Sequence, residues 1–159
     1  MAPFEPTEIS RGQPVAWVTL GTVLYLESGL RSIWPQVLAA SQALLQRPWA
    51  AGIKEVRRWD EPHWRGWDPR DVPGFLQELQ KMGPTRPPWR VKVADQAKFS
   101  TVSIDWQDVP AAQGQYPRAS WLRVRLPLGT SAEELFQTTM ELVGLLPVQQ
   151  GRAGYMCRE

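Results

Sequence analysis

The residues best suited to nucleophilic chemistry in this sequence are its one cysteine, Cys157, and its one histidine, His63. A reactive thiol needs an electropositive, partly exposed site, because the thiolate is the species that attacks. Cys157 lies three positions from the end of the sequence, in an apolar strand-like segment, which favours a packed cysteine with no catalytic role. A lone cysteine excludes an internal disulfide and fits a reducing compartment.

A second group of reactive side chains lies in one short stretch and comprises Asp60, Glu61, His63 and Asp68. Carboxylate oxygens and an imidazole nitrogen are common ligands of divalent cations. Their spacing matches no known metal-binding loop, and four arginines are interleaved with them, namely Arg57, Arg58, Arg65 and Arg70. We therefore predict a salt-bridged surface loop, with no metal and no cofactor.

Other catalytic patterns are missing from the sequence. Gly12, Gly21 and Gly29 are too dispersed to form a phosphate-binding loop, and no Gly-x-Ser-x-Gly elbow occurs. The adjacent pair Glu133-Glu134 cannot act as an acid–base pair on a helix, because neighbouring side chains diverge by about 100°. We predict that the protein is not an enzyme and has no catalytic residues.

The most distinctive segment is a Trp-rich loop between residues 57 and 70, with three tryptophans, two prolines and a glycine. In one interpretation the indoles fold back over a sheet edge. In the other they anchor a protein partner, and the interleaved charges set its register. Both interpretations can hold for different indoles. The candidate partner-binding residues are Trp59, Asp60, Glu61, Trp64, Trp67, Asp68 and Asp71.

The charge balance argues against most nucleic-acid binders. Eighteen basic and sixteen acidic residues give a net charge of +2, which is a weak electrostatic footprint. Residues 51–100 mix arginine with tryptophan, as single-strand binders do, but seven acids there offset ten basic residues. The sequence has no apolar run long enough to cross a membrane and no basic, signal-like start. These features argue against a membrane partner and against nucleic acid as the main partner.

Hydrophobic periodicity predicts both strands and helices. The expected strands cover residues 14–27, 53–56, 89–94, 98–106 and 119–128, with a last short one at 155–157. The first should be a central strand covered on both faces, because both of its faces are apolar. The strand at 119–128 alternates, with Leu122 and Val124 on one face and Arg123 and Arg125 on the other.

Three helices are expected, each with a recognisable start or stop. Ser32 begins the first, which Pro48 ends; Asp71 caps the second, which Gly83 stops. Thr130 or Ser131 begins the third. Its expected inner face comprises Leu135, Phe136, Thr139, Met140, Leu142 and Val143.

This order of elements predicts an α+β fold in which about three helices pack on a mostly antiparallel sheet. We expect a loose lead-in over residues 1–12 and a single domain over residues 13–159. A chain of 159 residues is long enough to bury a core without a metal or a disulfide.

Several segments resemble the immunity proteins of bacterial type VI secretion systems, in particular the type VI immunity family for VRR-NUC nuclease toxins. They are the opening strand with residues 24–29 (LYLESG), Trp34-Pro35 in the first helix, residues 121–128 (WLRVRLPL), and Leu146-Pro147 followed by Gly151 and Ala153-Gly154-Tyr155. The resemblance covers residues 13–157 as a pattern of elements and short motifs.

The resemblance implies a cytoplasmic, non-enzymatic protein that binds a cognate effector toxin and blocks it by occlusion. The alternatives are a general protein-interaction module and, third, an enzyme or a single-strand nucleic-acid binder. Family members usually continue past the last strand, so the stop at Glu159 predicts a shortened relative, a fragment or a degraded copy. The net charge does not suggest DNA mimicry. Asp60, Glu61, Asp68 and Asp71 are instead the acids expected to meet a basic patch on the toxin. The sequence leaves the oligomeric state open.

Overall fold

An antiparallel sheet organises the molecule. A computed structural model describes residues 8–10, 13–58, 62–68, 70–82, 89–95, 101–109 and 119–158. The strands are β1 (Glu8–Ser10), β2 (Gln13–Leu26), β3 (Glu55–Arg58), β4 (Arg65–Gly66), β5 (Trp89–Ala94), β6 (Ser103–Val109), β7 (Ala119–Leu126) and β8 (Val148–Arg158). Their order across the sheet is β8-β2-β7-β6-β5-β3-β4, and β1 pairs with the start of β2.

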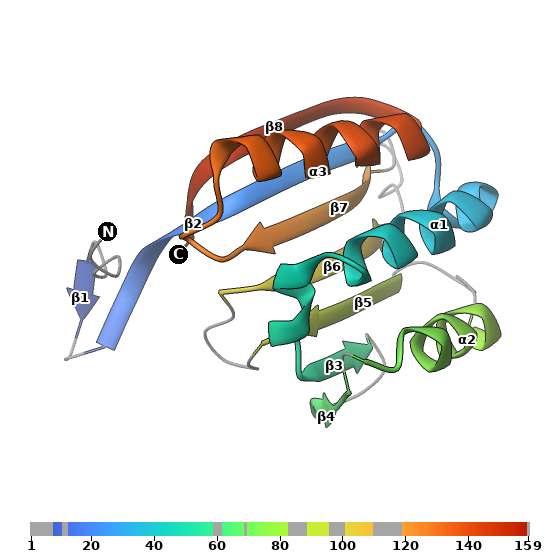
Figure 1. Ribbon diagram of the computed structural model, residues 1–159, viewed down its shortest axis with the longest axis horizontal. Helices are drawn as coiled ribbons and strands as arrows, with labels where there is room; N and C mark the ends of the chain where they lie inside the picture. The colour runs from blue at the N-terminus through green and yellow to red at the C-terminus, as the bar shows by residue number, and fades with distance from the viewer. Residues whose placement is uncertain are drawn as a thin grey trace.

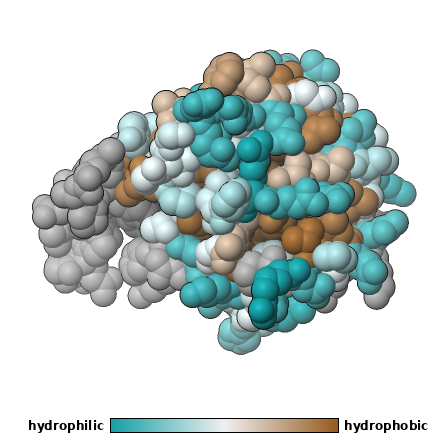
Figure 2. Space-filling view, in the orientation of Figure 1, coloured by the Kyte–Doolittle hydropathy of each residue, from teal (hydrophilic) through white to brown (hydrophobic). Residues whose placement is uncertain are grey.

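The helices lie together on one face of this sheet (Figure 1). They are α1 (Trp34–Leu45), α2 (Val72–Met82) and α3 (Ala132–Leu145), with short 3₁₀ turns η1 (Leu30–Ile33) and η2 (Pro48–Gly52). The space-filling view of this side shows hydrophobic residues interleaved with hydrophilic ones over the helices (Figure 2). The predicted α+β fold, with three helices on an antiparallel sheet, is confirmed.

The long strand β2 lies between β7 and β8 and pairs with both. Its even-numbered residues Leu20, Leu24 and Leu26 enter the hydrophobic core beneath the helices. The described helices all lie on the core side (Figure 1), yet Thr19 and Val23 on the other face of β2 are also buried, so both faces of this strand are shielded, as expected. Gly21 is required where β2 approaches β7, since a Cβ atom at this position would lie 2.0 Å from the Val124 carbonyl oxygen.

The core runs across the sheet as one cluster of buried residues. Leu122 and Val124 of β7, Ile104 and Trp106 of β6 and Val91 of β5 lie in it beneath α1. The buried Trp106 indole donates a hydrogen bond from Nε1 to the Ser41 hydroxyl of α1, at 3.0 Å. This bond gives the largest core side chain a partner for its one polar atom.

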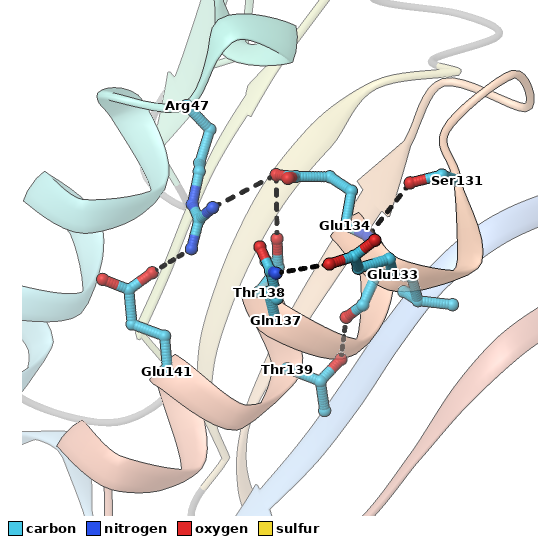
Figure 3. Close-up of polar contacts among 9 residues, drawn as sticks. Arg47, Ser131, Glu133, Glu134, Gln137, Thr138, Thr139 and Glu141 are labelled. Atoms are coloured by element: carbon cyan, nitrogen blue, oxygen red, sulfur yellow. Dashed lines mark hydrogen bonds and ion pairs between the residues drawn. The ribbon is translucent and has the colours of Figure 1, made fainter.

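A polar network fixes α3 against the end of α1 (Figure 3). The Arg47 guanidinium, just after α1, pairs with Glu134 at 3.3 Å and also with Glu141, so it bridges two turns of α3. Glu134 accepts a further hydrogen bond from Thr138, and its backbone N–H donates to the Ser131 hydroxyl at 3.1 Å. Ser131 is thus the N-cap of α3, as one of the two sequence predictions, Thr130 or Ser131, expected.

The predicted inner face of α3 is wrong for three residues. Phe136, Met140 and Val143 are 64%, 51% and 41% exposed. The side that meets the core carries Thr138 and Leu142, which are buried, with Leu135 packed beside them. Apolar residues lie on both sides of this helix, so periodicity alone did not show which side meets the sheet.

Three smaller expectations need correction. Ser32 lies in η1 and bonds the Gly29 carbonyl, while the N-cap of α1 is Ile33, without a side-chain hydrogen bond. The strand expected at 98–106 begins at Ser103. The last strand is much longer than 155–157, because β8 pairs with β2 from Val148 to Arg158. Strand β6 extends to Val109, and residues 110–118 lie outside the described residues.

Candidate functional site

The face of the sheet opposite the helices carries a concentration of basic side chains. Cross-strand partners point to the same face, so the register Lys92↔Asp105↔Arg123 places these three residues side by side across β5, β6 and β7. Arg125 lies two residues along from Arg123, and Arg152 of β8 is opposite Val23 of β2. Because alternate residues share a face, Arg90 and Arg125 belong to the same surface.

This surface is hollowed into a pocket of about 570 Å³. Its lining comes from four strands and comprises Thr19, Val23, Tyr25, Arg90, Lys92, Arg123, Arg125, Arg152, Tyr155 and Met156. Half of these ten residues are cationic at neutral pH. The volume lies within the roughly 300–1,000 Å³ typical of binding pockets.

An ion pair organises the β5 side of the pocket. The Arg90 guanidinium donates two hydrogen bonds to the buried Asp105 carboxylate, from Nε at 2.9 Å and from Nη2 at 2.7 Å. These hydrogen bonds raise the pKa of Arg90 above its ordinary value, although burial opposes the shift. Such a bidentate arrangement holds a guanidinium in one orientation.

Two of the basic groups also contact tryptophan rings. The Lys92 amine lies 5.5 Å from the centre of the Trp64 ring, and the Arg123 guanidinium lies 4.9 Å from that of Trp121. Cation–π contacts of this kind stabilise the positions of charged groups. These contacts help to hold the pocket walls in place.

The basic groups differ in exposure, which divides the pocket into a floor and a rim. Arg125 is 4% exposed and Lys92 is 9% exposed, and both form contacts within the chain. Arg123 is intermediate and Arg152 is exposed. Arg123 and Arg152 are therefore the cations that an approaching molecule meets first.

The Trp-rich loop is only partly within the described structure. Trp59, Asp60 and Glu61 lie outside the described residues. Trp64 is half-buried beside Lys92, while Trp67 packs on the core and lies 5.2 Å from the Phe75 ring, centre to centre. Trp67 thus matches the scaffold interpretation of the loop.

Two described acids among the candidate partner-binding residues, Asp68 and Asp71, have internal partners. Asp68 is exposed and accepts hydrogen bonds from the Arg70 guanidinium at 3.0 Å. The bond to Arg70 lowers the pKa of Asp68 below its ordinary value. Asp71 caps α2, since its carboxylate accepts the Gly74 N–H at 3.0 Å. Trp67 and Asp71 also line a smaller hollow of about 280 Å³ between β4 and α2.

The described residues contain no group of three or more His, Cys, Asp or Glu side chains that could hold a metal ion. His63 is exposed, and the side chain of Cys157 is outside the described part. Among the described helices, none is long and apolar enough to cross a membrane.

Sequence reasoning did not select the basic pocket as a site. Single strands do show basic residues alternating with buried ones, namely Arg123 and Arg125 on β7 and Arg90 and Lys92 on β5. The missing information was the strand order, which brings β8, β2, β7 and β5 onto one surface.

Comparisons with known proteins identify a similar fold and no family. No protein-family model matches the sequence, and no curated protein matches it. Among solved structures, the Pseudomonas aeruginosa T6SS protein PA0821 is similar over 90% of this chain, with a TM-score of 0.69 and 15% sequence identity. The matched region is 44% of that protein, so this chain spans less than half of its length.

Proposed function

We propose that this chain is an immunity protein of a bacterial type VI secretion system, which binds and neutralises a cognate effector toxin with nuclease activity. The observation that carries the proposal is the shared fold with a Pseudomonas T6SS protein over 90% of the chain. The short sequence motifs that resemble a type VI immunity family, such as residues 121–128, support it independently.

The proposed mechanism is stoichiometric occlusion, with no reaction catalysed by this chain. The sheet face on which no described helix lies offers a preformed surface, and preformed surfaces lose little entropy when they bind. The pocket gives that surface a concave shape, into which a protruding part of the toxin can fit. The proposed location is the cytoplasm of the cell that produces the toxin, where self-protection is needed.

Co-expression tests this function directly. A bacterial host that expresses the effector encoded beside this gene should stop growing, and expression of this chain should restore growth. The purified proteins should form a complex of defined stoichiometry by light scattering after gel filtration. Growth arrest that persists when both proteins are expressed at high level, with no complex formed, would reject the proposal.

A single-strand nucleic-acid binder is a second candidate, because the pocket combines five cations with Tyr25 and Tyr155. Basic grooves with aromatic side chains hold single strands. Binding of a poly-dT oligonucleotide, with an affinity that falls steeply as salt rises, would favour this function over toxin neutralisation.

A further inference from the structure

The pocket lies on the sheet face opposite the described helices, and the positive charge of its lining favours an anionic partner. We infer that it binds an acidic, carboxylate-rich segment that protrudes from the partner protein. This inference rests on the proposed function and names the surface and the chemistry through which that function would operate. It also reverses the polarity expected from the sequence, in which acids of the Trp-rich loop would meet a basic toxin patch.

The first argument is the excess of positive charge on this face. Five cationic side chains line the pocket. On the five strands from β8 to β5, Asp105 is the one acid among the described side chains that point to this face, and it is already bonded to Arg90. Lys92 and Arg125 have partners within the chain, so Arg123 and Arg152 at the rim are the cations that an anionic partner would meet.

The second argument is the match between arginine and carboxylate. Four of the five cations are arginines, whose planar guanidinium groups bind carboxylates through two parallel hydrogen bonds. Arg90 and Asp105 already form this arrangement inside the pocket, at 2.9 and 2.7 Å. A carboxylate of the partner would bind the rim arginines with the same geometry.

The third argument separates an acidic protein segment from a nucleic-acid strand. Single-strand binders combine a long basic track with open aromatic faces on which bases stack. Here the basic surface is a hollow of about 570 Å³, and its two aromatic residues are Tyr25, which is half-buried, and Tyr155, which already contacts another group of the chain. A short, protruding loop fits these dimensions better than an extended phosphate backbone does.

Charge reversal at the rim is the sharpest test. Arg123 and Arg152 line the pocket without being buried, so the double variant Arg123→Glu/Arg152→Glu should fold. The matched control is Arg31→Glu/Lys54→Glu, which changes the net charge equally at two exposed positions outside the pocket. Far-UV circular dichroism and the melting temperature establish that both variants are folded. If the first is not, Arg123→Gln/Arg152→Gln replaces it.

Association with the effector encoded beside this gene is measured by stopped-flow at low and high salt. We expect the rim variant to associate about tenfold more slowly or worse, with a weaker salt dependence, and to lose protection in co-expression. The control should associate at nearly the wild-type rate. A fluorescent poly-glutamate peptide should bind the wild type and the control but not the rim variant.

The outcomes separate the two proposals. If the rim variant binds and protects as the wild type does, the pocket is not the docking surface, and the immunity function stands. If the rim and control variants slow equally, the effect is net charge alone, which also overturns the inference. If poly-dT binds the wild type and the rim variant abolishes that binding while effector binding persists, the pocket is a nucleic-acid site. If the wild type neither binds nor protects, both proposals fail.

Discussion

Asp71 shows how one acidic side chain can be assigned to a structural role. It was a candidate for partner binding, and its carboxylate accepts the Gly74 N–H at the start of α2. Gly74 leaves room for this bond, because a Cβ atom there would lie 2.2 Å from an oxygen of Asp71. The cap occupies one carboxylate oxygen and orients the side chain along its own helix.

Two substitutions separate the cap from the charge. Asp71→Ala should lower the free energy of unfolding by about 1 kcal/mol, because the helix loses its N-cap. Asp71→Asn keeps an oxygen acceptor and should cost only a few tenths of a kcal/mol, mostly through the helix dipole. Urea denaturation measures both. Equal losses for the two variants would show that the negative charge, and not the cap, matters there.

Asp68 provides a prediction about pH. Its hydrogen bond from Arg70 lowers the pKa of the carboxyl below the ordinary value of 3.8. Because the pKa is lowered in the folded protein, the pair adds to the stability of the folded state at pH values above the ordinary pKa. This contribution is lost as the pH falls through the pKa of the folded state. We expect an NMR titration to place the Asp68 midpoint below 3.8, and Arg70→Ala to move it upward.

A midpoint that does not move in Arg70→Ala would contradict the assigned cause. The pair is fully exposed, so solvent screens it, and Arg70→Ala should leave the melting temperature nearly unchanged.

At the scale of elements, α3 carries both buried and exposed apolar residues. Leu142 is 1% exposed and packs into the core, whereas Met140, two positions earlier, is 51% exposed. Leu142→Ala should lower the free energy of unfolding by about 2–5 kcal/mol, because it leaves a cavity. Met140→Ala should change it by less than about 0.5 kcal/mol. Chemical denaturation of the two variants measures this contrast, and a large loss in Met140→Ala would mean that its side chain is covered.

A strand could be predicted from the sequence where its own residues alternate between apolar and charged. Ala119–Leu126 alternates apolar and charged residues, and the structure has β7 at this position. In contrast, β8 contains Gln149, Gln150, Gly151 and Gly154, which have weak strand propensity. Pairing with β2 along its length makes this segment a strand, and such a partner cannot be read from the segment itself.

The candidate site was less predictable than the fold for a related reason. A pocket lined from β2, β5, β7 and β8 depends on strand order and register, which join residues up to 137 positions apart, as the hydrogen bond from Thr19 to the Met156 carbonyl shows. The Trp-rich loop stood out because its residues are contiguous. Residues that are neighbours in the sequence are easily recognised as one group. The surface of a sheet, in contrast, combines residues from strands that are far apart in the sequence.

At the scale of the molecule, the core indicates one cooperative unit. A single cluster of buried residues joins Leu30 after β2, Val37 in α1, Leu79 in α2, Val91 in β5 and Leu142 in α3. Arg47 further ties α1 to α3. Since no element group has a core of its own within the described residues, loss of one part removes burial from the others.

We therefore expect unfolding in urea to be a single transition, as is usual for domains of this size. Tryptophan fluorescence, which includes the buried Trp106, should report tertiary packing, and far-UV circular dichroism should report helices and sheet. The two midpoints should coincide in the wild type. In Leu79→Ala, which opens a cavity under α2, both should shift together by an amount equivalent to about 2–5 kcal/mol. A shift confined to one probe would show that α2 and its strands unfold separately from β2, β8 and α3, and the single-domain prediction would then be wrong.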